Sequence, residues 1–557
     1  MGLAYLRPHV GADSARWTTL PGRRVVLAIA RTFTSTVRLL EALSVCRGDQ
    51  RIQVVFSFDD TSAFNAGTES LLLENGVCLL PWETAASIPA DLIVTASENV
   101  DLSGFSAPVV LLPHGVGFQK FVPDSLGRGR RLSGVVRAEF VDAPNVRTVV
   151  SHPAQRDQLR SVHPSLADRA EVVGDPVHDR IRAGARLRAD YRRRLGISDG
   201  HRLVTVTSTW GDQGLLGKRP LLPARLLAEL PHDRYRVAAV LHPNIWFAHS
   251  PWQVRHWLAD ALDAGLLLIP PERGWEAALI ASDCVIGDHG SVTLYGAAAD
   301  RPVLLGAFGM ESVPGTAIER LATTALLLDD AAPLLEQVEA AIGEYRPGRY
   351  AAVAQSAFSH VGEAGRRLAL LFYGLLGIPA PEGSGRVRAA EPAEPGRAEV
   401  TAFEVHTRLS GTRTVSVERF PAAVRAPEPV PEGTVRHLSA CESEQDDALV
   451  HSASVLYRAE PLPSANAARA WAEAALDRHP GCVLACTGVP GGGLVAVRGG
   501  RIIEVRAVGD SADRERPDPC LQAALVYAVL ADRRDTSGDY TLRVGGRTWT
   551  CSLLPDR

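Results

Sequence analysis

The chain has 557 residues, enough for about three to four domains at roughly 150 residues each. Hydrophobic residues make up 46% of it and charged residues 22%, a globular composition that excludes disorder as the dominant state. The formal charge of −4 argues against a dedicated nucleic-acid binder, so no nucleic acid is expected as a partner. Lysine occurs only at positions 120 and 218, so the abundance of arginine by itself says little about phosphate binding.

The cysteines and apolar runs predict where the protein works. Eight cysteines lie along the chain without the spacing of a disulfide framework, which favours reduced thiols and a cytoplasmic protein. Residues 1–17 lack the apolar core of a signal peptide. The longest apolar run, 368–378, is too short to span a bilayer and predicts a buried helix. We therefore expect membrane contact to be peripheral at most, at the inner face.

Residues 24–176 alternate short apolar runs with helical segments. A helix is expected over 34–45, and apolar runs cover 24–30, 52–58, 77–82, 91–97, 108–112, 148–153 and 170–176. Continuous apolar runs separated by helices predict a parallel sheet covered on both faces. We predict a Rossmann-like domain over 1–185.

The same alternation starts again after residue 185. Strands are expected at 202–210, 235–244, 266–270, 284–290 and 301–308, and helices at 186–197, 219–230, 252–265, 275–283, 291–300 and 350–376. This predicts a second Rossmann-like domain over 186–378, so the fold class is α/β with two doubly wound modules. Two such modules leave a cleft between them, where the carboxyl ends of their strands face each other and a ligand is expected.

The rest of the chain has a different composition. Residues 379–435 are rich in Pro, Glu and Gly, which predicts a flexible linker, with a hairpin over 399–420. Residues 436–557 predict a small α+β domain, with helices over 465–479 and 519–534 and Gly-Gly hairpins at 499–500 and 545–546. The sequence does not predict the role of this last domain.

One polar strand end stands out in the first module. His114 follows the apolar run 108–112 and precedes Gly115 and Gly117. An imidazole can accept a proton near neutral pH, and glycines let backbone and ligand approach closely. The alternative is a structural histidine in a tight turn.

Three polar strand ends follow in the second module. Thr209 and Trp210 end one strand, where they could hold a phosphate or a base, or simply pack. His242 is followed by Pro243, which keeps the histidine backbone extended and suits a diphosphate contact. The third end, Asp288-His289-Gly290-Ser291, opens a helix whose first amides suit an anion, unless Asp288 or Ser291 only caps it. We favour a ligand site, because all these ends are expected at one cleft.

Three other patterns give weaker evidence of a functional site. Cys482 and Cys486 have no second pair at zinc spacing, so no metal site is predicted. The run 488–494 lacks the Lys and Ser/Thr of a phosphate loop. Asp179, after the turn Gly174-Asp175-Pro176, is expected to cap a helix.

Over residues 24–376 these motifs, in this order, resemble the CDP-glycerol glycerophosphotransferase family of teichoic-acid polymerases, which has the GT-B fold. The matching segments are His114-Gly115, Gly174-Asp175-Pro176 with Asp179, Thr209-Trp210, His242-Pro243, Asp288 to Ser291, and Arg301-Pro302-Val303. The chain departs from the family at Val240 and Leu241, where the family has Arg and Pro, and at His289 and Gly290, where the family has Tyr and Ser.

The resemblance implies a cell-wall transferase that uses a nucleotide-diphosphate donor. Glycerol phosphate or a related polyol phosphate would pass from a CDP-linked donor, held by the second domain, to a hydroxyl acceptor held by the first. The acceptor could be a polymer or a lipid-linked chain. No cofactor and no metal are implied. The implied catalytic residues are His114 and Asp288, and the implied substrate-binding residues are Gly115, Thr209, Trp210, His242, Gly290 and Ser291.

Two alternatives stay open. His242-Pro243-Asn244 also fits the pattern of UDP-N-acetylglucosamine 2-epimerases, which makes a nucleotide-sugar enzyme, epimerase or glycosyltransferase, the second hypothesis. The third is a catalytically silent GT-B scaffold that binds a partner.

Overall fold

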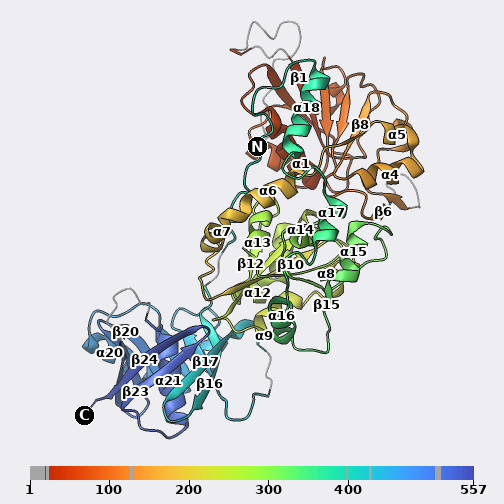
Figure 1. Cartoon of the computed structure of the whole chain (residues 1–557). Coiled ribbons are helices and arrows are strands. Elements are labelled where there is room, and N and C mark those ends of the chain that lie inside the picture. Colours follow the sequence, from red (N-terminus) through yellow and green to blue (C-terminus); the bar gives the residue numbers. More distant parts are fainter. Residues whose placement is uncertain are drawn as a thin grey trace.

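The computed structural model describes residues 19–20, 24–123, 130–396, 399–425, 429–508 and 516–556. Figure 1 shows three lobes that follow one another along the molecule, with the first module at one end and the last domain at the other. The second module lies between them.

The first module is a parallel sheet of seven strands in the order β3-β2-β1-β4-β5-β8-β9. The strands are β1 (Arg24–Ala30), β2 (Ile52–Phe58), β3 (Leu79–Leu80), β4 (Leu92–Thr95), β5 (Val109–Leu111), β8 (Val146–Val150) and β9 (Ala170–Val172). Helices cover it: α1 (Phe33–Leu43), α2 (Thr68–Glu74), α3 (Trp82–Ala85), α4 (Pro153–Val162) and α5 (Pro164–Asp168). Its central strands are buried on both faces, which explains their continuous apolar runs. A short antiparallel pair, β6 (Phe121–Pro123) and β7 (Arg130–Leu132), stands apart from this sheet.

The second module repeats this plan with six parallel strands in the order β12-β11-β10-β13-β14-β15. They are β10 (Arg202–Ser208), β11 (Tyr235–Leu241), β12 (Leu267–Ile269), β13 (Cys284–Gly287), β14 (Val303–Leu305) and β15 (Leu326–Leu327). Its helices are α7 (Arg188–Arg194), α8 (Leu215–Lys218), α9 (Leu222–Glu229), α10 (Pro243–His249), α11 (Pro251–Trp257), α12 (Ala259–Asp263), α13 (Trp275–Ala281), α14 (Ser291–Ala298), α15 (Ala317–Thr324) and α16 (Leu334–Gly343). The predicted pair of doubly wound modules is confirmed.

The chain crosses between the modules three times, the last time after α18. Helix α6 (Pro176–Gly184) leads from the first to the second and is capped by Asp175, which accepts hydrogen bonds from the amides of Val177 and His178. Asp179 does not cap its own helix. Its carboxylate accepts hydrogen bonds from the amides of Gly362 and Ala364, where the chain returns to the first module.

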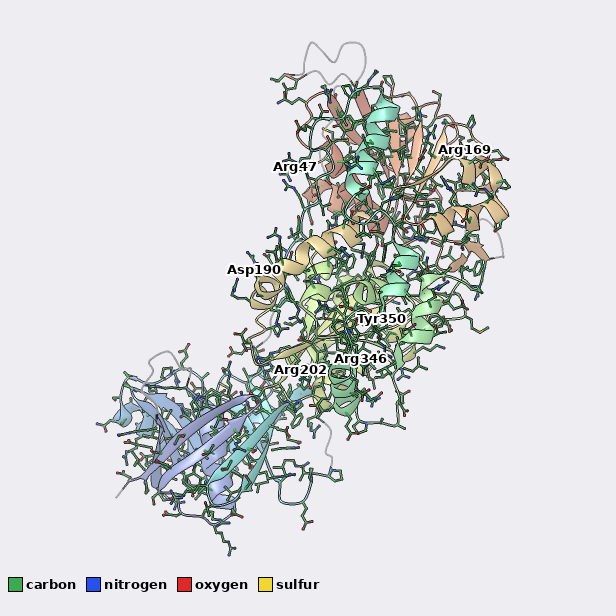
Figure 2. The ribbon with its side chains drawn as sticks, viewed as in Figure 1. Arg47, Arg169, Asp190, Arg202, Arg346 and Tyr350 are labelled. Atoms are coloured by element: carbon green, nitrogen blue, oxygen red, sulfur yellow. The ribbon has the colours of Figure 1, made fainter. Side chains whose placement is uncertain are left out.

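The helix predicted over 350–376 is in fact two helices, α17 (Ala351–Ala357) and α18 (Ala364–Leu376). His360 and Gly362 between them have φ angles of 48° and 85°, which an α-helix cannot contain. Tyr350, just before α17, points into the second module, where its hydroxyl accepts a hydrogen bond from the amide of Val303 (Figure 2). Helix α18 instead buries its apolar side in the core of the first module, so the break lets one segment serve both modules.

The linker predicted from residue 379 stays a prediction, but part of this segment packs against the second module. Ala390 and Ala393 are buried in the core of the second module. The carbonyl of Ala390 accepts a hydrogen bond of 2.6 Å from the hydroxyl of Tyr191. Small side chains let this Pro-rich segment lie flat against the module, a property that composition alone does not distinguish from flexibility.

The last domain is a closed barrel, which corrects the predicted small α+β domain. Its strands have the order β16-β17-β23-β24-β22-β21-β20-β19-β18. They are β16 (Ala402–Ser410), β17 (Thr414–Pro421), β18 (Val435–Cys441), β19 (Val455–Arg458), β20 (Leu484–Val489), β21 (Gly492–Val497), β22 (Arg501–Val508), β23 (Gly538–Val544) and β24 (Arg547–Pro555). The hairpin predicted within the linker is β16 and β17, which are paired in the barrel wall.

Three helices accompany the barrel: α19 (Asp447–Ser452), α20 (Ala465–Arg478) and α21 (Pro519–Ala531). Helix α21 is apolar on all sides and shares one core with the strands (Figure 1). All eight cysteines are free thiols. Among the described residues, no helix combines the length and the hydrophobicity needed to cross a membrane, and no cluster of three His, Cys, Asp or Glu side chains could hold a metal ion.

Candidate functional site

A cleft between the two modules brings together the carboxyl ends of strands from both sheets. Its volume is about 160 Å³. A cavity of this order holds a group of about the size of benzene. Seven of the eight predicted site residues line it: His114, Gly115, Thr209, His242, Asp288, Gly290 and Ser291.

His114 lies in this cleft beside a buried carboxylate. Its Nδ1 is 3.5 Å from Oε2 of Glu98, and its side chain is 32% exposed, against 7% for Glu98. Glu98 follows β4, and His114 follows the neighbouring strand β5. The pairing of these strands therefore places the two side chains together and turns the other ring nitrogen, Nε2, away from Glu98.

Glu98 is held as a carboxylate. Its Oε1 accepts a hydrogen bond of 3.1 Å from Arg131, which also donates to Asn99. Burial opposes ionisation, but the charges of His114 and Arg131 outweigh it and lower the pKa of Glu98 to about 2. Sequence analysis missed Glu98, although its position at the end of the apolar run 91–97 was a usable signal.

The loop that carries His114 approaches the start of α14 closely. A Cβ atom added to Gly115 would lie 2.9 Å from Oγ of Ser291, so the two modules nearly touch here. The amide of Val116 donates to the same Oγ, at 3.4 Å. The first amides of α14 have no partner within the helix, and the helix dipole favours an anion beside them. Gly290 is the N-cap residue and brings no side chain to that position.

Asp288 organises the strand ends of the second module. Its two carboxylate oxygens accept hydrogen bonds of 2.7–2.8 Å from the amides of Thr209, Leu215 and Gly290. These bonds join the ends of β10 and β13, where the strand order of the sheet reverses. Burial raises the pKa of Asp288, and the charge of His289 and these donors oppose that shift. The predicted catalytic role stays a prediction; the surroundings suit a residue that positions others.

His242 presents a neutral imidazole. Its Nδ1 accepts a hydrogen bond of 3.1 Å from the amide of Asn244, which caps α10. Burial, together with the charges of Lys120 and His114, lowers the pKa of His242 well below its usual 6.5. The proton of the neutral ring is therefore on Nε2, which can donate a hydrogen bond to a ligand.

Lys120 is a cleft residue that sequence analysis did not single out. It comes from the first module, yet its Nζ donates to Oγ1 of Thr209 at 3.4 Å. The same ammonium lies 5.7 Å from the centre of the Trp210 ring. Trp210 itself is not in the lining and contacts Phe64, so the substrate contact predicted for it stays a prediction. The scarcity of lysine in this arginine-rich chain was the signal that could have pointed to Lys120.

Backbone hydrogen bonds join the modules beside Lys120. The amide of Phe121 donates to the carbonyl of Glu311, at 2.7 Å, and the amide of Val313 donates to the carbonyl of Gln119, at 2.9 Å. Arg38 of the first module and Tyr295 of the second also line the cleft, and both donate hydrogen bonds to Asp175. Polar contacts between the modules therefore border the cleft at two places.

The arrangement offers three chemical capacities. His114, paired with a carboxylate, can accept a proton from a hydroxyl. The start of α14, Ser291 and the neutral His242 can donate hydrogen bonds to an anion. Lys120 supplies a positive charge on the same side of the cleft as Thr209. A proton acceptor facing an anion site is the arrangement needed to transfer a phosphoryl or glycosyl group to a hydroxyl.

No protein-family model and no curated protein sequence matches the chain. Among solved structures, a wall teichoic acid polymerase, TagF, aligns with 66% of this chain and 92% of its own, at 12% identity and a TM-score of 0.44. A glycosyltransferase from Rickettsia africae aligns with 63% of this chain and 98% of its own, at 11% identity and a TM-score of 0.38. UDP-GlcNAc 2-epimerase from Methanocaldococcus jannaschii aligns with 63% of this chain and 100% of its own, at 12% identity and a TM-score of 0.41. Likeness of this degree leaves the activity to be argued from this chain's own residues.

Proposed function

We propose that the protein is a GT-B transferase that moves a phosphoryl-linked group from a nucleotide-diphosphate donor to a hydroxyl acceptor. The observation that carries this proposal is that His114, with its carboxylate partner, lines the same cleft as the start of α14, from a loop that contacts Ser291. A base and an anion site in one cleft between two modules can hold an acceptor and a donor at once.

In the form that the sequence resemblance favours, the donor is CDP-glycerol or a related CDP-linked polyol. The acceptor oxygen attacks the β-phosphorus, and its proton passes to Nε2 of His114. The bond from the β-phosphorus to the bridging oxygen breaks, and CMP leaves with the additional negative charge. Ser291, Nε2–H of His242 and the first amides of α14 stabilise that charge.

The first experiment is a binding panel on the full chain by calorimetry. CDP and CDP-glycerol are expected to bind more tightly than UDP, UDP-N-acetylglucosamine, ADP or GDP. If a UDP compound binds more tightly, the protein would still be proposed as a transferase, but with a UDP-linked donor. The second experiment offers glycerol-phosphate acceptors and follows CMP release; nucleotide binding without release of any product under these conditions would favour the silent scaffold.

A further inference from the structure

Lys120 reaches across the boundary between the modules. It precedes β6 in the first module, but its ammonium group lies among residues of the second. Nζ is 3.4 Å from Oγ1 of Thr209 and 3.9 Å from Oε1 of Glu311. The Lys120 backbone forms a bridge with Ser312, which fixes the side chain at this point of the cleft.

The positive charge of Lys120 is only loosely matched. Glu311 lies at the limit of an ion pair and already accepts a hydrogen bond of 2.7 Å from Nε2 of His289. The carboxylate of Asp288 is occupied by three backbone amides. In the part of the chain that the structure describes, the ammonium therefore has no carboxylate closer than 3.9 Å. Burial lowers the pKa of Lys120, so an anion placed beside it would relieve the cost of keeping it charged.

We propose that Lys120 binds the diphosphate of the donor and so completes, from the first module, an anion site whose other members belong to the second. This inference rests on the proposed function, because it gives the donor phosphates their cationic partner. His242, Ser291 and the start of α14 donate hydrogen bonds but carry no full charge. Lysine is a common phosphate ligand, because its compact ammonium group offers three donors and a full charge.

A consequence concerns how the two modules are held together. The segment with Lys120 pairs with residues 311–313 through two backbone hydrogen bonds. A donor held by Lys120 on one side and by Ser291 on the other contacts both modules at once. Donor binding is therefore expected to stabilise the contact between the two modules that the structure shows.

The test measures binding of CDP, UDP and inorganic pyrophosphate to the full chain by calorimetry. Lys120→Met is expected to weaken binding of the diphosphates by roughly 10- to 100-fold, the range for a lost charged hydrogen bond. Lys120→Arg should recover part of this loss. Lys218→Met is the matched control, because Lys218 is the only other lysine and lies exposed on α8. Diphosphate affinity unchanged in Lys120→Met would overturn the inference.

A second measurement uses the wild-type protein and does not depend on the folding of a variant. An amine-reactive reagent can modify only the two lysines and the amino terminus. Pyrophosphate or CDP is expected to protect Lys120 from modification, and to leave Lys218 unprotected, when the digested protein is analysed by mass spectrometry. Equal labelling of Lys120 with and without ligand would also overturn the inference.

The outcomes separate this inference from the proposed function. If pyrophosphate protects Lys120 but no nucleotide binds and no transfer occurs, the anion site is supported and the proposed transferase function is refuted. If donor binding and turnover are unchanged in Lys120→Met, the proposed transferase function stands and the role of Lys120 is refuted. If the wild-type protein binds neither pyrophosphate nor any nucleotide, both the role of Lys120 and the proposed function are refuted.

Discussion

His114 differs from the other cleft histidines in combining a carboxylate partner with an exposed ring. His242 is neutral and uses Nδ1 to cap a helix, and His289 is fully buried between Glu311 and the amide of Gly309. His114 is 32% exposed and has Glu98 at 3.5 Å. A base needs access to substrate together with a partner that stabilises its protonated form, and among these three only His114 has both.

His114→Ala is expected to keep donor affinity and to lose turnover. Loss of a general base typically lowers the rate by ~10²–10⁴. Product release and donor affinity would be measured on the same preparations, with thermal unfolding to show that the fold is intact. Equal turnover in the variant and the wild type would remove His114 from the mechanism.

Glu98→Gln tests the carboxylate as a positioning residue. Loss of such a partner commonly lowers activity by about 10- to 100-fold, and here kcat should fall while donor Kd is unchanged.

The substitution Glu98→Gln should also alter the stability of the protein in acid. Because the pKa of Glu98 is lowered to about 2, its contribution to the free energy of unfolding is complete above about pH 4.5 and is lost as pH falls toward 2. The stability difference between wild type and variant should therefore shrink over that window; a constant difference would contradict the assignment.

His242 is expected to bind the donor in its neutral form. Since its pKa lies well below 6.5, the ring carries no charge at pH 6 or at pH 8. His242→Gln should therefore weaken donor binding by the same factor at both values. A loss at pH 6 that disappears at pH 8 would show that the protonated ring binds the phosphates.

At the scale of elements, α14 brings the second module's donors to the base. Its N-cap, Gly290, is held by Asp288, and the same carboxylate holds the end of β10. A further polar contact, between the hydroxyls of Thr207 and Thr293, ties the helix to that strand at 2.9 Å. The helix start is thus fixed by the sheet and does not need a ligand to order it.

Ser291→Ala is expected to affect binding more than folding. The hydroxyl accepts one long hydrogen bond, 3.4 Å, from the other module, so its loss should cost at most about 1 kcal/mol of the free energy of unfolding. Donor affinity should fall about tenfold. Ser161→Ala, at an exposed serine on α4 that bonds only to its own helix turn, is the control. A large loss of stability with donor affinity unchanged would assign Ser291 to structure.

The elements of the two modules could be predicted because parallel strands buried on both faces leave continuous apolar runs. The barrel could not, because it closes through partners far apart in sequence, such as Thr414 with Thr541. The same reason applies to the site. His114 and Ser291 follow apolar runs and are visible as strand ends, whereas Lys120 enters the site only because a loop of one module crosses to the other.

At the scale of the whole molecule, the barrel adjoins the second module on the side away from the first module (Figure 1). Arg419 of β17 makes the main polar contact. Its guanidinium donates to both oxygens of Asp233, at 2.6–3.2 Å, and to Asp518 at 2.8 Å. Its carbonyl accepts from the amide of His232, which extends the contact to the backbone.

Replacing Arg419 tests whether the barrel and the modules unfold together. The side chain is buried, so Arg419→Ala would leave the Asp233 carboxylate without its cation inside the interface. Breaking a buried pair in this way costs about 3–5 kcal/mol. We expect calorimetry to show a lower transition for the variant, or two transitions where the wild type has one, with donor affinity preserved because the cleft is remote. Arg413→Ala, at an exposed arginine of the same barrel, should change neither. If Arg419→Ala unfolds like the wild type, the Arg419 side chain does not hold the barrel to the second module; if it loses donor binding instead, the barrel and the cleft are coupled.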